Sequence, residues 1–284
     1  MKTTHFLLTL SIAGLEGAGC IIPPPQAATA APGSAASIGA GAGAAVPAAT
    51  AAPAATESAA PAAAAAPPAP APSSGPVALP PGFRDCGPGG MLDDGEDGNN
   101  QTMPAGDRGG YWYTFRDKKG TTIDPTAGED GGTFAMSPGG HTGQFAARFH
   151  GKIGTGAPLF GGMGMNFVDP KAAYDASKYA GISFWARKGE TSTPKVRLKV
   201  PDANTDPDGG SCVECFNDFG GDLTLTPEWK MYIYPFTAMK QMPGWGNPRK
   251  PHITPAKIYG IQFQVNVPSA NYDIYIDDLK FICK

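Results

Sequence analysis

The sequence contains little charge, and it lacks features that define several large classes of protein. Only 17% of the 284 residues are charged, the formal net charge is −3, and no run of lysines and arginines stands out. Nucleic acid is therefore not an expected partner, because phosphate binding needs a concentrated basic surface. After residue 20, no segment is apolar enough to form a membrane-spanning helix, which needs about twenty residues.

The short motifs of common catalytic sites are also missing. The sequence has no Gly-x-Ser-x-Gly, no His-Glu-x-x-His and no Gly-x-x-x-x-Gly-Lys-Ser/Thr. Acidic residues are present, but most stand in Gly- and Pro-rich segments, where such residues commonly form turns. An enzyme is therefore the less favoured interpretation.

Residues 1–20 are typical of the signal peptide of an exported lipoprotein. Lys2 supplies a positive start, and residues 5–15 form an apolar run too short to span a bilayer. Gly17-Ala18-Gly19-Cys20 resembles the lipobox of bacterial lipoproteins, although Gly17 stands where leucine is usual. We expect lipidation of Cys20 and attachment to the cell envelope, at the outer membrane or cell surface, through lipid alone. Secretion without an anchor is the alternative.

Residues 21–82 have the composition of a linker. Alanine makes up about half of residues 26–72, proline recurs every few residues, and Glu57 is the only charge between Ile21 and Pro81. Proline interrupts helices, and too few large apolar side chains are present to offset the entropy of ordering the chain. We predict a disordered Ala/Pro-rich tether with a reach of roughly 45 Å or more.

Residues 83–284 are sufficient for one domain with a substantial core. Short runs rich in Val, Ile and aromatic residues recur between Gly, Pro, Asp and Asn, and apolar and polar residues alternate within them. This pattern predicts an all-β domain, an antiparallel sandwich or barrel. At 172–179 we expect at most one helical turn. The expected strands are 111–115, 144–149, 163–167, 181–188, 195–200, 229–234, 261–267 and 271–281.

Four cysteines remain once Cys20 is set aside. In an exported protein an even number indicates disulfides, and four cysteines allow three pairings. We favour Cys86–Cys283, which would join the two ends of the domain, and Cys212–Cys215 within one loop. The Cys-x-x-Cys motif could alternatively be half of a zinc site or a redox pair, but no second pair of ligands accompanies it.

Several short motifs follow one another in a familiar order across residues 91–283. They are Leu92-Asp93-Asp94 with Glu96-Asp97-Gly98, Gly110-Tyr111-Trp112-Tyr113, Tyr179-Ala180-Gly181-Ile182-Ser183-Phe184-Trp185-Ala186, Leu225-Thr226-Pro227-Glu228-Trp229-Lys230, Ile261-Gln262-Phe263-Gln264 and Tyr275-Ile276-Asp277-Asp278-Leu279. This series resembles the galactose-binding-like jelly-roll group, in particular carbohydrate-binding modules of families 11 and 30. The resemblance implies a two-sheet antiparallel jelly-roll β-sandwich with a glycan groove on its concave sheet.

The same resemblance implies a structural calcium ion where the first and last strands meet. Glu96, Asp277 and Asp278 match the acidic positions that often hold this ion. Gly95 departs from the pattern, since an aromatic residue is usual there. Calcium prefers six to eight oxygen ligands, so backbone carbonyls would have to complete the site.

Sugars are recognised by aromatic faces and by planar polar groups that bond paired hydroxyls. The outward faces of the expected strands carry such residues, although polar side chains are also normal on any solvated sheet. The candidate sugar contacts are Trp112, Tyr113, Trp185, Arg187, Arg197, Trp245, Gln262 and Gln264.

The sequence thus predicts a surface-tethered monomer that binds polysaccharide without cleaving it. A β-glucan is the ligand that the resemblance implies. Two alternatives stay open: a carbohydrate-active enzyme, either a glycoside hydrolase with two placed carboxylates or a lyase, and an adhesion module that binds protein.

Overall fold

The computed structural model describes residues 78–128 and 134–284. The predicted signal peptide 1–20 with Cys20, and nearly all of the predicted tether 21–82, lie outside the described residues. The described ranges comprise the predicted domain 83–284 with a gap at 129–133. Within them no helix is long and apolar enough to cross a membrane.

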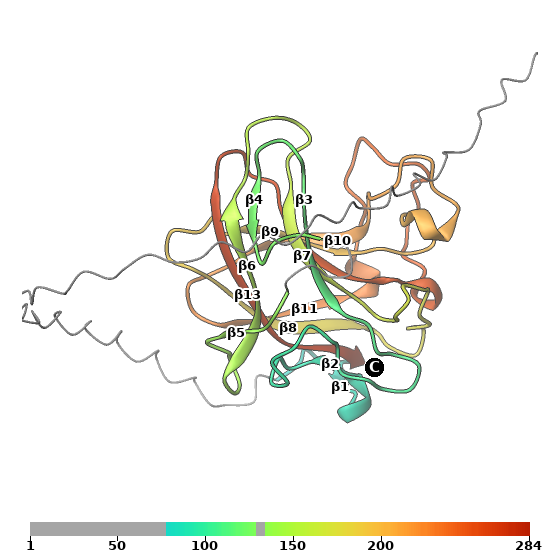
Figure 1. Cartoon of the computed structure of the whole chain (residues 1–284). Coiled ribbons are helices and arrows are strands. Elements are labelled where there is room, and N and C mark those ends of the chain that lie inside the picture. Colours follow the sequence, from blue (N-terminus) through green and yellow to red (C-terminus); the bar gives the residue numbers. More distant parts are fainter. Residues whose placement is uncertain (1–77, 129–133) are drawn as a thin grey trace, which may run out of the picture. The chain divides into compact units, whose positions relative to one another are not determined.

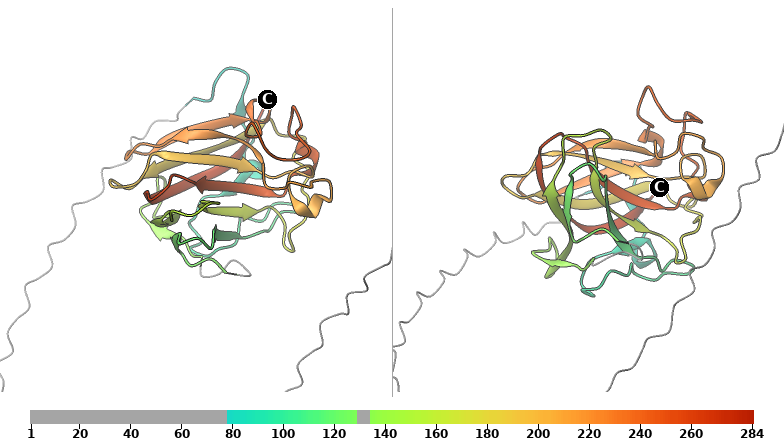
Figure 2. Two further views of the ribbon diagram at one scale, coloured as in Figure 1. Left: turned by 90° about the horizontal axis from the view of Figure 1, so that it is seen from above. Right: turned by 45° about the horizontal axis from the view of Figure 1, so that its top comes forward.

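The larger of two antiparallel sheets is built around the last strand, β13 (Asn271–Cys283). Its other strands are β1 (Arg84–Asp85), β2 (Met91–Asp93), β4 (Thr122–Asp124), β5 (Ser137–Pro138), β6 (Phe145–Lys152), β8 (Gly181–Lys188) and β11 (Lys230–Pro235). The hydrogen-bonded order is β11-β8-β13-β6-β4, with β1 and β2 paired to β13 and β5 paired to β6. Figure 2 shows β13 (red) between β8 (yellow) and β6 (yellow-green).

The smaller sheet packs against the larger one (Figure 1). Its strands are β3 (Trp112–Arg116), β7 (Gly161–Asn166), β9 (Lys195–Val200), β10 (Phe219–Thr224) and β12 (Gly260–Val265). Their order is β10-β9-β12-β7-β3, and all of the described pairings are antiparallel. The predicted two-sheet antiparallel β-sandwich is confirmed.

The core lies between the sheets and follows the predicted alternation. On β8, Ile182 and Phe184 point into the core, and on β9 Leu198 does the same from the facing sheet. The ring centroids of Phe184 and Phe263 lie 5.0 Å apart in an edge-to-face contact that joins β8 to β12. Burial of such side chains supplies the main driving force for folding, at about 25 cal/mol per Å² of apolar surface.

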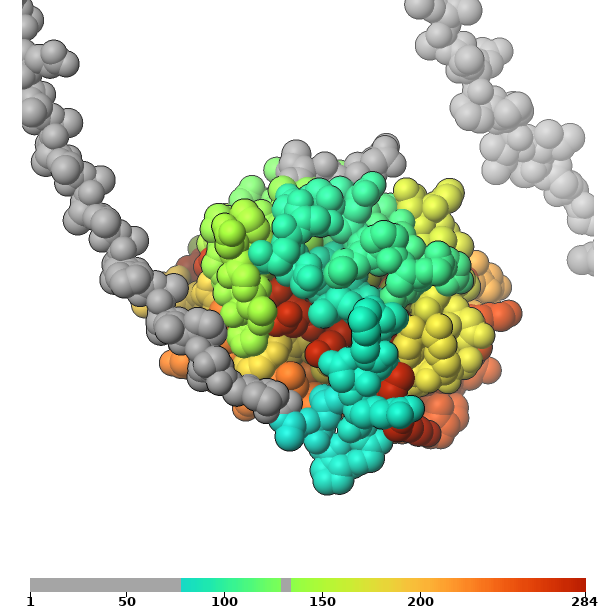
Figure 3. Space-filling view, turned by 90° about the horizontal axis from the view of Figure 1, so that it is seen from below, coloured from blue at the N-terminus to red at the C-terminus, as the bar shows by residue number. Residues whose placement is uncertain are grey.

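The two ends of the described domain lie side by side. β1 and β2 pair with β13, and the predicted disulfide Cys86–Cys283 is present. Figure 3 shows the early residues (cyan) against the last strand (red). The second predicted disulfide, Cys212–Cys215, is also present, and it removes the zinc and dithiol interpretations of that motif for this oxidised form.

The segment 172–179, where at most one helical turn was expected, contains a single hydrogen-bonded turn, in which Tyr179 N donates to Ala176 O at 3.0 Å. Before this turn, Tyr174 exchanges both backbone hydrogen bonds with Ile258. In the two described ranges the helical elements are short 3-10 turns at Pro88–Gly90, Pro207–Gly209, Phe236–Ala238 and Pro255–Lys257.

Candidate functional site

The outer face of the smaller sheet carries a groove of about 600 Å³. Side chains of β3, β9 and β12 that point away from the core form one part of its lining. Two loop segments, 158–160 and 215–218, supply most of the rest, together with Met242 and Trp245. A strand scaffold with loop residues around it is a common setting for ligand binding.

Two glycines on β7 leave room for this groove. Gly164 lies opposite Tyr113 on one side and Gln262 on the other, and Gly162 is paired in the same way with Phe115. A Cβ atom on Gly164 would lie 2.9 Å from Tyr113 Oη, and one on Gly162 would lie 2.5 Å from Phe115 Cζ. The absence of side chains here lets the aromatic rings lie over the middle of the sheet.

Two exposed aromatic side chains lie at the edge of the groove. Phe216 is 59% exposed and Trp245 is 44% exposed. Their loops are joined, because Val213 N donates to Asn247 O at 2.8 Å and Gly246 N donates to Glu214 Oε2 at 3.1 Å. The Cys212–Cys215 disulfide closes the first loop just before Phe216. Exposed aromatics held by a braced loop offer flat apolar surfaces at little entropic cost.

A buried ion pair forms the polar part of the groove. Lys199 Nζ lies 3.0 Å from Asp218 Oδ2, and the two side chains are only 9% and 1% exposed. Lys199 Nζ also donates to Gln264 Oε1 at 3.2 Å. The second carboxylate oxygen, Asp218 Oδ1, is buried and has no hydrogen-bond partner among the described residues. A buried acceptor without a donor is costly, so this atom is suited to accept a hydrogen bond from a ligand.

The other polar groups of the groove are fixed by neighbours. Gln262 Nε2 donates to Tyr113 Oη at 2.9 Å, and burial raises the pKa of the Tyr113 hydroxyl, which keeps it neutral. Arg197 is paired with Asp222 at 3.0 Å and also donates to Lys240 O at 2.9 Å. Both cations of the groove, Lys199 and Arg197, are therefore neutralised by a carboxylate.

The structure brings together five of the eight predicted sugar contacts. They come from β3, β9, β12 and the loop after β11, so they are distant in sequence, yet all of them line the groove. These residues are Tyr113, Arg197, Trp245, Gln262 and Gln264. Sequence reasoning missed Phe115, Phe216 and Asp218 as site residues, although Phe115 follows Tyr113 by two positions and therefore shares its face.

The remaining three predicted contacts, Trp112, Trp185 and Arg187, do not line the groove. Trp112 is 1% exposed in the core, where its Nε1 donates to Asp93 Oδ2 at 2.8 Å, so its ring cannot stack on a ligand. Trp185 and Arg187 belong to β8 in the larger sheet. They point away from the core on the opposite side of the sandwich from Arg197 and Gln262.

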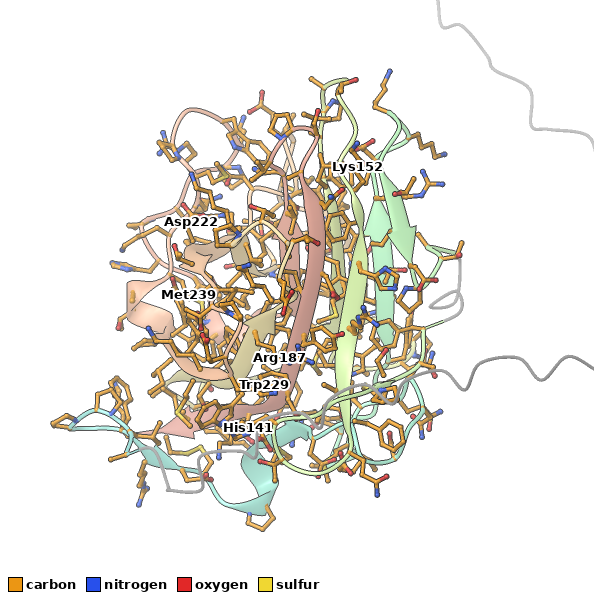
Figure 4. All side chains as sticks on the ribbon, turned by 90° about the vertical axis from the view of Figure 1, so that its left-hand side faces the viewer. His141, Lys152, Arg187, Asp222, Trp229 and Met239 are labelled. Atoms are coloured by element: carbon orange, nitrogen blue, oxygen red, sulfur yellow. A yellow bond between two sulfur atoms is a disulfide. The ribbon has the colours of Figure 1, made fainter. Side chains whose placement is uncertain are left out.

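Trp185 and Arg187 take part in an aromatic and cationic cluster on the larger sheet. The His141 ring stacks on Trp185 with centroids 3.7 Å apart, and the Arg187 guanidinium lies 3.6 Å from the Tyr275 ring centroid. Figure 4 shows His141, Arg187 and Trp229 close together near one end of this sheet. These stacking contacts use ring faces that a sugar would need, so we assign this cluster a packing role.

The three acidic residues predicted to bind calcium are already occupied by donors. Glu96 accepts from the amides of Gln144 and Phe145, and Asp278 accepts from His141 and Thr142. Asp277 accepts from the amides of His141 and Asp278. In the described part of the chain no three acidic, His or Cys side chains meet as a metal cluster.

Two buried carboxylates nevertheless share one narrow cavity where β2 meets β13. Asp93 and Asp277 both line it, next to Gly95. Burial raises the pKa of Asp93 to about 7 and that of Asp277 to about 8, and the charges of neighbouring carboxylates add to both shifts. A hard cation would compensate both charges, so of the predicted trio it is Asp277, together with Asp93, whose burial would suit calcium.

Comparisons of the sequence find no matching protein family and no matching curated protein. The structure is similar to the family 11 carbohydrate-binding module of a cellulosomal cellulase of Clostridium thermocellum, with 16% identity and a TM-score of 0.48 over 72% of this chain and 95% of that one. A family 11 module from the same organism, in complex with a β-1,3-1,4-mixed-linked tetrasaccharide, is 16% identical, with a TM-score of 0.47 over 68% of this chain and 95% of that one. A family 30 module of a cellulosomal cellulase, also from Clostridium thermocellum, is 13% identical, with a TM-score of 0.44 over 65% of this chain and 96% of that one. Families 11 and 30 are the two that the sequence motifs resemble.

Proposed function

We propose that this domain binds a polysaccharide in the groove of the smaller sheet. The observation that carries the proposal is Asp218, whose buried Oδ1 lacks a donor among the described residues, beside the Lys199 ammonium. A sugar hydroxyl can donate to the carboxylate while a neighbouring hydroxyl accepts from Lys199. Phe216 and Trp245 at the groove edge supply apolar surfaces for the faces of sugar rings.

Binding without cleavage is the form of this function that the groove favours. A glycoside hydrolase uses two carboxyl groups on either side of the bond that is broken. Among the described residues that line the groove, Asp218 is the single acid, and Lys199 holds it as an ion pair. A carboxylate held in this way is a positioned hydrogen-bond acceptor, and no second acid of the described lining stands across the groove from it.

The proposal is tested by affinity electrophoresis and calorimetry of the whole protein with a panel of polysaccharides. Mixed-linked β-glucan is the first probe, and release of reducing or unsaturated ends is followed in the same samples. We expect binding without release, and a loss of at least tenfold in affinity for Phe216→Ala and Trp245→Ala. Trp229→Ala, on the larger sheet, is the matched control. Folded protein that binds no polysaccharide, or binding equally weakened by the control, would contradict the proposal.

We further propose that calcium stabilises the frame through Asp93 and Asp277. Backbone carbonyls would complete its coordination, since two carboxylates cannot supply six to eight oxygens. The ion would neutralise the two buried charges and so fix β2 against β13. Its role is structural, because none of the described residues that line this cavity lines the groove.

We also propose that the domain acts at the cell envelope, held by lipid on Cys20 and spaced from the membrane by residues 21–82. The support is the sequence alone, because these residues lie almost entirely outside the described ranges. Fractionation of expressing cells after labelling with a radioactive fatty acid tests it. Label that is lost in Cys20→Ser supports the anchor, whereas unlabelled protein in the medium supports secretion.

A further inference from the structure

A second hollow, of about 420 Å³, lies beside the groove. Four of the six residues that line it carry a positive charge or can gain one: Lys240, Arg249, Lys250 and His252. Gln241 and Pro251 complete the described lining, which contains no carboxylate. The sequence shows only a Lys-Pro-His segment after Arg249, and Lys240 joins it through the fold.

The lysines and the arginine of the hollow have no acidic partner among the described residues, unlike five other basic side chains of the domain. Arg148, Arg197, Lys171, Lys199 and Lys280 each form an ion pair. None of the ion pairs between described residues includes a residue of the hollow. In a chain of net charge −3, three neighbouring lysine and arginine side chains without carboxylates form a local excess of positive charge, which favours an anion.

Hydrogen bonds of Gln241 and of Lys240 hold the backbone around the hollow in place, and the other charged side chains take no part in them. Gln241 Oε1 accepts from Lys250 N at 2.7 Å, and Gln241 Nε2 donates to Asn217 O at 3.0 Å. Lys240 Nζ donates to Pro251 O at 3.2 Å, which joins the two sides of the hollow. These hydrogen bonds hold residues 240–241 and 249–252, which carry the basic side chains, against each other.

The hollow is connected directly to the groove. Arg197, which lines the groove, donates to Lys240 O, and Asn217, another groove residue, donates to Met242 O at 2.9 Å. Met242 of the groove and Gln241 of the hollow are also adjacent in sequence, so a long polymer chain could contact both sites. Both cations of the groove are already paired, with Asp222 and Asp218. Of the two sites, the hollow is therefore the one whose described side chains offer unpaired positive charge.

We propose that the hollow binds an anionic substituent, a carboxylate or sulfate, on the polysaccharide whose neutral sugar rings occupy the groove. This inference rests on the proposed function and specifies its ligand class as an acidic polysaccharide. A nucleic acid fits less well, because it carries a phosphate on every residue and would need unpaired cations along the groove as well.

The first experiment measures the anion site without any polysaccharide. Sodium sulfate is titrated into ¹⁵N-labelled protein, with sodium chloride of equal ionic strength as reference. We expect saturable shifts of the Lys250 and His252 amides that disappear in K240Q/R249Q/K250Q. The control K178Q/K230Q/K284Q changes the charge equally at exposed lysines near the larger sheet and should keep the shifts. Shifts that do not saturate, or that persist in the first variant, would overturn the proposal.

The second experiment compares mixed-linked β-glucan with the same polymer after partial oxidation to uronate and after partial sulfation. We expect at least tenfold tighter binding of one or both acidic forms than of the neutral polymer at low salt. The variant K240Q/R249Q/K250Q should remove this difference, and the control K178Q/K230Q/K284Q should keep it. The two modified polymers distinguish carboxylate from sulfate. Equal binding of neutral and acidic forms would contradict anion binding in the hollow. Binding that Phe216→Ala leaves unchanged would contradict polysaccharide binding in the groove. Tighter binding of duplex DNA than of either acidic polymer would also overturn the proposal.

Discussion

Lys199 Nζ and Asp218 Oδ2 lie 3.0 Å apart beneath the groove, with almost no exposure to solvent. This pair makes the groove both polar and electrically neutral. Removing one partner of a buried pair leaves the other charge without compensation, whereas removing both does not. The pair therefore allows the stability of the fold to be separated from binding in the groove.

We predict that Asp218→Ala or Lys199→Met alone destabilises the protein by about 3–5 kcal/mol. The double variant Lys199→Met/Asp218→Leu should recover most of this loss, because it leaves no buried charge. Urea unfolding measures each free energy, and binding of the best polysaccharide of the panel should be absent in all three variants. Single and double variants of equal stability would show that the pair is solvated.

Asp117 is predicted to make the stability depend on acid pH. Its carboxylate accepts from Thr121 Oγ1 at 2.6 Å and from Phe160 N at 2.8 Å, which fixes the segment before β7. Burial raises the pKa of Asp117, but the hydrogen bonds outweigh this and hold the pKa below its usual value. Its stabilisation is therefore present above about pH 4 and is lost as the pH falls through the lower folded-state pKa.

The corresponding test is urea unfolding of wild type and Asp117→Asn at pH 7 and pH 3. The variant should be about 1–3 kcal/mol less stable at pH 7, because the amide cannot accept the same bonds. The difference should shrink at pH 3. Asp107→Asn, at an exposed position, serves as control. A difference that is independent of pH would assign the effect to shape and not to charge.

The two disulfides should have different roles. Cys86–Cys283 closes a loop with a sequence separation of 197, whereas Cys212–Cys215 spans 3. On chain entropy, replacing the first pair by alanine should cost about 5 kcal/mol and the second about 2 kcal/mol. Polysaccharide affinity should respond in the opposite order, since the short disulfide braces Phe216. Thermal unfolding and calorimetry on both double variants measure the two effects.

Calcium removal should lower the melting temperature without changing affinity at a temperature where the protein stays folded. The ion would compensate the buried charges of Asp93 and Asp277, and none of the described residues that line their cavity lines the groove. Asp277→Asn should abolish the response to chelator, whereas Glu96→Gln should retain it. A melting temperature that is independent of chelator in wild type would exclude a structural calcium ion here.

Much of the fold was predictable because alternation is a local property. The period of two in 181–188 and 195–200 places the core residues correctly whatever the topology. It also separates Trp112 from Tyr113, since adjacent strand residues point to opposite faces and so cannot line the same face of a sheet. Which sheet a strand joins is not local, and this is why Trp185 and Arg187 were grouped with residues on the other side.

The loop residues of the site were beyond the reach of periodicity. Phe216 and Asp218 follow the Cys212–Cys215 disulfide in an irregular segment, and Phe216 has a positive φ of 71°. Their loop is held against β9 and β12 by hydrogen bonds of neighbouring residues. Val213 N donates to Asn247 O, and Asn217 Oδ1 accepts from Met242 N. The basic hollow is a further case, because Lys240 reaches Pro251 only in the folded chain.

The glycines beneath the aromatic rings provide the most direct test of the groove. Gly164→Ala would place a methyl group 2.9 Å from Tyr113 Oη, 2.8 Å from Gln262 Cγ and 2.9 Å from the backbone oxygen of Ile261, so both side chains and β12 must move. We expect at least a tenfold loss in polysaccharide affinity, with a destabilisation of about 1–3 kcal/mol from overpacking. Gly89→Ala, where a Cβ meets nothing within 4 Å, is the matched control. Calorimetry at a temperature where both variants are folded separates the two effects. Unchanged affinity in Gly164→Ala would place the ligand outside this groove, because a ligand that touches Tyr113 and Gln262 cannot be indifferent to their displacement.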